Sequence, residues 1–344
     1  MAPATGVRSA DVLSDVLGAV RLTGAVYFDF ELTPPWVAEA PPSSEIAAIV
    51  MPGAQRVIEY HVVARGSAWG HAVGQPPIHL KEGDLLIFPQ GDGHVLSSAP
   101  GMRAAPDLSA YARPTTPLPL MYEFGGGGAD RARVICGFLG LDERPFNPLL
   151  SALPPTIHLQ ANGAEASTGW LNTLVHIAMG ETGRATPGSE NVLARLSELM
   201  FVEAVRRYLA TLPAAERGWL AGLRDEVVGR ALAALHGSPA HVWTVEGLAR
   251  LVGVSRSVLA ERFTDLLGQP PMQYLALWRM QLAGRYLGEG RQVGEVAGLV
   301  GYESEAAFSR AFRKIVGVAP ATWRRSALGP GTASRAYTST ATTS

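Results

Sequence analysis

The alternation of apolar and polar residues divides the chain into a β-rich part and a helical part. Residues 11–22 carry apolar side chains at helical spacing and predict a short amphipathic helix. Over residues 25–141, short runs rich in β-branched and aromatic residues are separated by Gly, Pro and Asp; they are GAVYFDFEL, AAIVM, RVIEYHVVAR, DLLIFP and ARVICGFLGL. Such runs predict an antiparallel sandwich or barrel of short strands.

The second part of the chain is predicted to be helical from Pro155 onward. Segments 168–179, 191–211 and 217–236 carry apolar residues at helical spacing, and residues 190–209 show the strongest pattern. A helix of this kind beside a β-domain is either a linker or dimer contact, or it packs on its own domain. The pattern alone leaves both interpretations open.

These patterns predict a multidomain α+β protein. Residues 11–160 are expected to form an antiparallel, jelly-roll-type β-barrel domain with helices, and residues 224–326 an all-α domain. Residues 161–223 are predicted to form a helical linker or dimerisation region between them. Residues 1–10 and 327–344 lack the large apolar groups of a packed core and are expected to be disordered.

Composition and charge narrow the class of protein. No run of 18 apolar residues is free of charges and breakers, and the N-terminus lacks the basic and apolar stretches of a signal peptide. The one cysteine, Cys136, excludes an intrachain disulfide and fits a reducing cytoplasm. Residues 1–223 hold 15 basic and 21 acidic residues, whereas residues 224–325 hold 13 and 9. A net charge of +4 in the last third is modest support for a nucleic-acid partner.

Two segments of the last third match each other. The first begins with LARLVGVS at Leu248 and the second with VAGLVGYE at Val296, an offset of 48 residues. The match continues, with an offset of 49 after one insertion, through Phe263 and Phe312, Gly268 and Gly317, Pro271 and Pro320, and Tyr274 and Trp323. Each segment spans about 30 residues.

Local physical chemistry predicts a helix-turn-helix in each segment. A first helix ends at Gly253 or Gly301, where a left-handed turn costs glycine least, and Ser255 or Ser304 caps the next helix. That second helix buries one narrow apolar stripe, formed by Leu259 and Phe263 or by Phe308 and Phe312. Its other face can enter a DNA major groove. The alternative is an all-α repeat with solvated charged faces, which the double match disfavours.

Residues 224–325 resemble the DNA-binding domain of AraC/XylS-type transcription regulators. The similarity is carried by WTVEGLA at residues 243–249, GYESEAAFSRAFRK at 301–314 and GVAPATWRR at 317–325. The resemblance implies seven helices, with the two reading helices about one DNA turn apart on the same face of the duplex.

The resemblance also implies which residues contact DNA. Its base-reading positions fall on Ser257, Ala260 and Glu261 in the first unit, and on Glu305, Ala306, Ser309 and Arg310 in the second. Glu261 departs from the family, because many members carry arginine there; it either reads a base or pairs with Arg256 or Arg262. The stronger candidates for phosphate or base contacts are Arg256, Arg262, Arg310, Arg313 and Lys314.

The β-rich part resembles the cupin-type sensor domain of one AraC-like subgroup. Gly83 to His94 has the spacing G-x5-P-x-G-x2-H, which is similar to the second cupin motif. Gly53-x5-Glu59-Tyr60-His61 is similar to the first motif, with Glu59 in place of its first histidine. Arg65 stands near the position of the usual glutamate. The resemblance therefore implies an incomplete two-histidine, one-carboxylate site, which argues against oxygenase-type metal chemistry.

Three side chains are nevertheless candidate metal ligands: His61, His94 and Cys136. Together with water or Glu59 as a fourth ligand they would suit Zn²⁺ or another divalent metal in the barrel. The alternative is that Cys136 is a small buried hydrophobe and that the histidines hydrogen-bond an effector. An effector pocket is expected around Tyr60, His61, Trp69, Phe88 and His94, each of which is equally explained as barrel core.

The sequence therefore predicts a cytoplasmic, sequence-specific DNA-binding transcription regulator that performs no catalysis. Its expected partners are a double-stranded DNA operator, RNA polymerase, a small-molecule effector and a second copy of the chain. A metal-dependent cupin enzyme with a helical appendage is the alternative, and an architectural DNA-binding protein with an inert barrel is a third interpretation.

Overall fold

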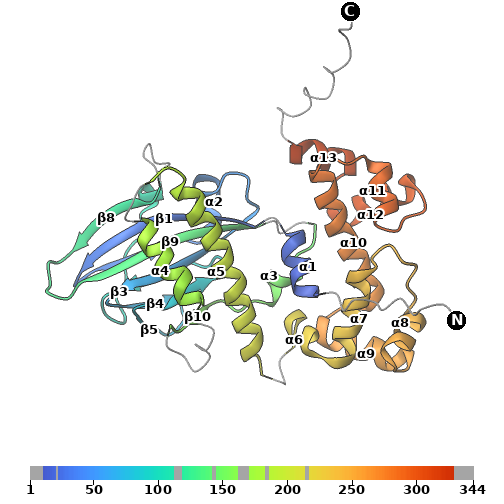
Figure 1. Ribbon diagram of the computed structural model, residues 1–344, viewed down its shortest axis with the longest axis horizontal. Helices are drawn as coiled ribbons and strands as arrows, with labels where there is room; N and C mark the ends of the chain where they lie inside the picture. Colours follow the sequence, from blue (N-terminus) through green and yellow to red (C-terminus); the bar gives the residue numbers. More distant parts are fainter. Residues whose placement is uncertain are drawn as a thin grey trace, which may run out of the picture. The chain divides into compact units, whose positions relative to one another are not determined.

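The computed structural model describes residues 11–20, 22–111, 118–141, 145–161, 170–182, 186–213 and 217–328, and these form two compact units. The β-rich unit takes in the described residues of 21–142 and 150–212, and the helical unit those of 1–20, 143–149 and 213–344 (Figure 1). The segments expected to be disordered lie outside the described residues, apart from residues 327 and 328 at the end of a helix. None of the described helices is long and apolar enough to cross a membrane.

The β-rich unit contains two sheets. The larger one has the strand order β10 (Ile157–Leu159), β6 (Leu85–Phe88), β3 (Arg56–Arg65), β9 (Ala132–Leu141), β1 (Thr23–Thr33) and β8 (Leu120–Gly125). The smaller one has the order β2 (Val37–Ala40), β7 (His94–Ser97), β4 (Ser67–Ala72) and β5 (Ile78–Lys81). Three short helical segments also belong to the first half of the chain: α2 (Ser43–Val50), η1 (Leu108–Tyr111) and α3 (Pro148–Ala152).

The predicted antiparallel arrangement holds for every described strand pair except one. Strand β8 pairs with β1 in parallel, with Phe28 opposite Leu120. The two strands are far apart in the sequence, so no tight hairpin forces them to run in opposite directions. The larger sheet is thus mixed, and the described pairs of the smaller sheet are all antiparallel.

The outer face of the larger sheet is covered by α4 (Trp170–Thr182) and α5 (Ser189–Thr211), as Figure 1 shows. Helix α5 approaches β1 closely at Gly24, where a Cβ atom would lie 2.4 Å from the carbonyl oxygen of Ala194. Its buried stripe includes Leu193, Met200 and Phe201. The strongest predicted helix therefore packs on its own domain, and the region 161–223 is not one linker, because α4 and α5 belong to the β-rich unit.

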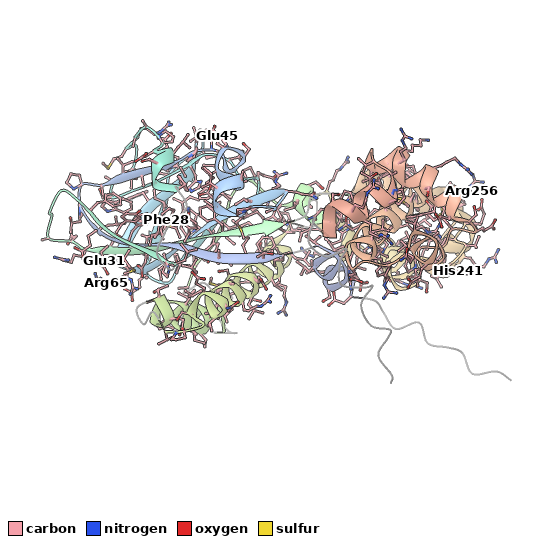
Figure 2. All side chains as sticks on the ribbon, turned by 90° about the horizontal axis from the view of Figure 1, so that it is seen from above. Phe28, Glu31, Glu45, Arg65, His241 and Arg256 are labelled. Atoms are coloured by element: carbon pink, nitrogen blue, oxygen red, sulfur yellow. The ribbon has the colours of Figure 1, made fainter. Side chains whose placement is uncertain are left out.

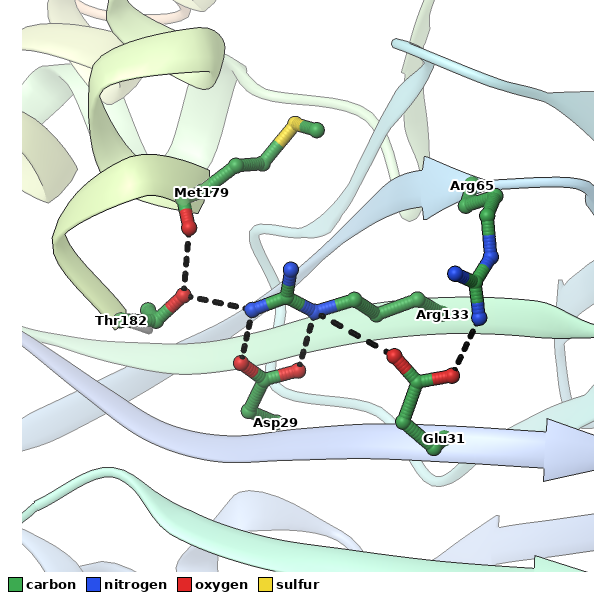
Figure 3. A network of polar contacts seen from close by, with 6 residues as sticks. All are labelled: Asp29, Glu31, Arg65, Arg133, Met179 and Thr182. Atoms are coloured by element: carbon green, nitrogen blue, oxygen red, sulfur yellow. Dashed lines mark hydrogen bonds and ion pairs between the residues drawn. The ribbon is translucent and has the colours of Figure 1, made fainter. Parts of the chain in front are cut away.

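A buried ion pair anchors the end of α4 to the sheet (Figure 3). Asp29 on β1 is fully buried and accepts two hydrogen bonds from the Arg133 guanidinium on β9, at 2.9 and 2.5 Å. The same guanidinium donates to Thr182 Oγ1 on α4 at 2.9 Å. Removing one partner of such a pair would leave the other charge buried without compensation, which is strongly destabilising. The network therefore favours the arrangement in which the end of α4 stays attached to β1 and β9.

The helical unit holds the seven helices that the resemblance implies over residues 224–325. They are α7 (Glu226–Gly237), α8 (Val245–Val252), α9 (Arg256–Leu267), α10 (Pro271–Gly288), α11 (Val293–Leu299), α12 (Glu305–Val316) and α13 (Pro320–Leu328). Helices α1 (Val12–Ala19) and α6 (Trp219–Arg224) also belong to this unit. The grouping of α1 differs from the predicted domain boundary at residue 11, because α1 packs on α7 and α10.

The helix-turn-helix turns form as the local sequence predicts. Gly253 and Gly301 both have φ +81°, in the left-handed region. Ser255 Oγ accepts from the Val258 amide, and Ser304 Oγ accepts from the Ala307 amide. The predicted apolar stripes of α9 and α12 are fully buried. The pairs α8–α9 and α11–α12 are therefore two helix-turn-helix units, with α10 between them in the sequence.

We expect alanine at Gly301 to destabilise the helical unit more than alanine at Gly253. Both glycines have the same positive φ, so each substitution carries the left-handed penalty of ~1–2 kcal/mol. Only at Gly301 would the new Cβ also lie 2.7 Å from backbone atoms of Ala240; nothing lies within 4 Å at Gly253. Urea unfolding of the two variants measures the difference. Equal losses of stability would contradict the close approach at Gly301.

Candidate functional site

A cavity of about 530 Å³ lies inside the β-rich unit and is lined by both sheets. Its walls are mainly apolar and include a set of aromatic side chains: Phe28, Phe30, Trp36, Tyr111, Tyr122, Phe124 and Phe138. Small residues of β2 and of the segment 104–111 line it as well. Its size falls within the range of ligand pockets, roughly 300–1,000 Å³.

Four polar side chains meet at one part of the cavity wall. Glu59 and His61 stand two residues apart on β3 and so point to the same face of the sheet. Cys136 on β9 lies directly opposite His61 in the strand pairing, and His94 comes from β7 of the other sheet. The four residues line the cavity and are each at most 5% exposed. We call them the polar cluster.

Hydrogen bonds link three members of the polar cluster into a chain. His94 Nδ1 lies 3.1 Å from the carbonyl oxygen of Asp92, which can only accept, so Nδ1 carries the proton. His94 Nε2 is then an acceptor for His61 Nε2–H at 2.7 Å. His61 Nδ1 in turn accepts from the Cys136 thiol at 2.8 Å. Each ring nitrogen of His61 and His94 thereby donates or accepts a hydrogen bond while both rings stay neutral.

Burial keeps the polar cluster uncharged at neutral pH. It lowers the pKa of His94 to about 4 and holds the pKa of His61 well below its usual range. It raises the pKa of Glu59 to about 8 and the pKa of the Cys136 thiol well above its usual range. Among the described residues, Glu59 Oε1 has no hydrogen-bond partner, and Oε2 lies 3.7 Å from His94 Nε2. Glu59 is therefore the one incompletely satisfied member of the cluster.

Of the predicted metal ligands, the structure brings His61 and His94 together with Glu59, the candidate fourth ligand. Glu59, His61 and His94 offer one carboxylate oxygen and two ring nitrogens within 4.8 Å of one another. Cys136 contacts the other nitrogen of His61, on the far side of the ring from His94. Glu59 thus completes the two-histidine, one-carboxylate set that the motif spacing suggested was incomplete. Arg65 is exposed and pairs with Glu31 at 2.5 Å (Figures 2 and 3).

The other predicted effector residues do not line the cavity. Tyr60 points to the outer face of the sheet, where its hydroxyl lies 2.5 Å from Ser197 Oγ of α5. Trp69 stacks on His79, with ring centroids 4.7 Å apart. Phe88 is fully buried and stacks on His94 at 3.9 Å. Of the five predicted residues, only His61 and His94 line the cavity.

The predicted set missed most of the cavity-lining residues, which come from β1, β2, β8, β9 and the segment 104–111. The alternation of Phe28, Phe30 and Leu32 along β1 was the available signal. It predicts one buried face but does not say whether that face meets a core or a cavity.

On the first reading helix, α9, both arginines have acidic partners. Arg256, which Figure 2 shows at the surface of the helical unit, pairs with Glu246 at 3.0 Å. Arg262 pairs with Asp225 at 2.7 Å. Within the part of the chain that the structure describes, Glu261 forms no ion pair with either arginine, in contrast to one of its two predicted roles. Glu261 and Ser257 are exposed, and Ala260 is half-buried.

On the second reading helix, α12, the basic residues are differently placed. Arg310, Arg313 and Lys314 are exposed, and none forms an ion pair with any residue in the described part of the chain. The predicted reading positions Glu305 and Ala306 are exposed, and Ser309 is half-buried. Helix α12 therefore presents more uncompensated positive charge than α9.

Comparison with known proteins matches both units. A cupin family model matches residues 11–210, and a helix-turn-helix domain model matches residues 248–326. AraC-like transcription regulators of Streptomyces lividans and Streptomyces antibioticus are each 35% identical, over 79% of this chain and 88% of theirs. The HTH-type transcriptional regulator AlkR of Acinetobacter baylyi is 30% identical over 79% of this chain and 89% of its own. The chain thus belongs to the AraC-like transcription regulators, with an N-terminal cupin domain and a C-terminal helix-turn-helix domain.

Proposed function

We propose that this protein is an effector-responsive transcription regulator in which α12 is the main base-reading helix. The observation that carries the proposal is the contrast between the two reading helices. The arginines of α9 already have carboxylate partners, whereas Arg310, Arg313 and Lys314 of α12 have none among the described residues. A cation without an internal partner gives up no ion pair when it binds a phosphate or a base edge.

Helix α9 then positions the domain more than it reads sequence. If Arg262 contacted DNA instead of Asp225, its ion pair with Asp225 would be lost. Asp225, which also caps α7, would then lack its cationic partner. Glu261 on the same helix repels phosphate, although a carboxylate can accept from cytosine N4. Both features lower the gain in free energy from base contacts by α9.

The cavity of the β-rich unit is proposed to bind the effector. Its aromatic walls favour a mainly apolar small molecule, because burying such a ligand removes apolar surface from water. The incompletely satisfied Glu59 favours a ligand with one polar group, because a buried polar atom without a partner is costly. Binding would change DNA affinity through a coupling free energy between the two sites.

The remaining features of the proposal follow from this role. The protein acts on a DNA operator in the cytoplasm, as a homodimer that communicates with RNA polymerase, and no catalytic step is needed. Selection of bound sequences from random duplexes by the purified full chain tests the function. Enrichment of one motif supports it, and retention of all sequences equally would favour an architectural DNA-binding protein instead.

We expect Arg310→Ala to weaken operator binding by ~1–3 kcal/mol and to relax specificity at one base position. Arg195→Ala is the matched control, because Arg195 is an exposed arginine of α5 that pairs with Glu198. Binding is measured by fluorescence anisotropy on the selected duplex at fixed salt. Unchanged affinity of the Arg310 variant would refute its role as a reading residue.

Filling the cavity is expected to abolish binding of an apolar probe. Ala110 lines the cavity, so Ala110→Trp places an indole inside it, whereas Ala210→Trp adds the same group to an exposed position of α5. The neutral dye N-phenylnaphthylamine is titrated into the full chain, and its fluorescence is followed. We expect saturable binding by the parent and the Ala210 variant and at least tenfold weaker binding by the Ala110 variant. Equal binding by all three would place the dye elsewhere.

A further inference from the structure

Glu59 is a buried carboxyl group with an unpartnered oxygen, aimed at two histidine nitrogens. It is 2% exposed, and its Oε1 atom has no hydrogen-bond partner among the described residues. A carboxyl group in this position is costly unless something binds it. We propose that Glu59, His61 and His94 hold a divalent first-row transition-metal ion in the wall of the cavity.

The donor set suits such an ion. Two imidazole nitrogens and one carboxylate oxygen are ligands that zinc, iron, cobalt and nickel accept. Three protein ligands leave at least one coordination position for water or for a bound molecule, as in zinc sites that are not purely structural. Because all three residues line the cavity, that position faces the proposed effector.

The second contacts of the histidines decide which ring nitrogen can bind the ion. His94 Nδ1 donates to the Asp92 carbonyl oxygen, which leaves Nε2 free to bind the ion. His61 Nδ1 accepts from the Cys136 thiol at 2.8 Å, so its Nε2 can bind the ion once the ring proton moves from Nε2 to Nδ1. Such contacts orient the rings and fix the tautomers. Cys136 is therefore a positioning residue in this site, and not a ligand.

Binding the ion requires a small local opening. His61 Nε2 and His94 Nε2 lie 2.7 Å apart, where they share a hydrogen bond. Two nitrogen ligands of a tetrahedral zinc ion, each ~2.05 Å from the metal, lie about 3.3 Å apart. The rings must separate by about half an ångström, and the ion then replaces the proton between them. In the same step the proton of His61 Nε2 is transferred to Nδ1, which then donates to the Cys136 sulfur, and the Glu59 carboxyl group releases its proton to solvent.

Metal titration of the full chain tests the site directly. The purified protein is stripped with a chelator and titrated with Co²⁺, followed by its visible absorption, and the Co²⁺ is then displaced with Zn²⁺. We expect one equivalent to bind. Glu59→Gln keeps the shape of the side chain but cannot supply the carboxylate that would bind the ion, and it is expected to weaken binding at least tenfold. His79→Gln is the matched control, since His79 is exposed on β5 and stacks only on Trp69.

The variant Cys136→Ser tests whether Cys136 positions His61 or is itself a ligand of the metal ion. We expect it to retain one equivalent of Co²⁺ with affinity reduced by ~10–100-fold, the range for loss of an outer contact. The parent protein is expected to show no thiolate-to-cobalt charge-transfer band in the near ultraviolet. Such a band, or unchanged binding by Glu59→Gln in a variant whose circular dichroism matches the parent, would overturn the assignment, as would absence of stoichiometric binding by the parent.

The metal site is an addition to the proposed function, and either one can be refuted while the other stands. Operator binding and dye binding are measured on the same chelator-treated protein. If both persist and no metal binds, the metal site is refuted and the regulator with an apolar effector stands. If metal binds and Arg310→Ala leaves operator binding unchanged, the metal site stands and the reading role of α12 is refuted.

Discussion

The hydrogen bond between His61 and His94 is the contact on which the interior of the β-rich unit depends. His61 comes from the larger sheet and His94 from the smaller one, so their contact joins the two sheets inside an otherwise apolar space. Polar groups buried in such surroundings must satisfy one another, since each unpaired one costs about 1–3 kcal/mol. The chain from Cys136 to the Asp92 carbonyl meets that requirement for both histidines, whereas Glu59 Oε1 has no partner among the described residues.

The sequence predicted the helix-turn-helix units well because their signals are local. The left-handed glycines, the serine caps and the apolar stripes all act within one or two helical turns. The location of α1 was not predictable in the same way. Its periodicity predicts an amphipathic helix, but not which of two cores the apolar face joins, and the answer depends on contacts with residues more than 200 positions later, such as Gln281 with the Ala19 carbonyl.

In the candidate site, the motifs predicted the two histidines, and strand geometry explains what they missed. Tyr60 and His61 are neighbours on one strand, so their side chains must point to opposite faces, and only one of them can line the cavity. The same rule places Glu59 beside His61. The partnership of His61 with Cys136 depends on the register between β3 and β9, which no local pattern specifies. Glu59, which stands in place of the first histidine of the motif, therefore faces the cavity beside His61.

Strand β3 also gives the cavity a physical connection to α5. Glu59 and His61 face the cavity, while Tyr60 between them reaches Ser197 of α5 on the opposite face. Helix α5 is also held to β1 at Gly24, which leaves little room for sliding. A ligand shifts an equilibrium only as far as its affinities for the two states differ. Helix α5 is also the last element of the β-rich unit before the chain enters the helical unit.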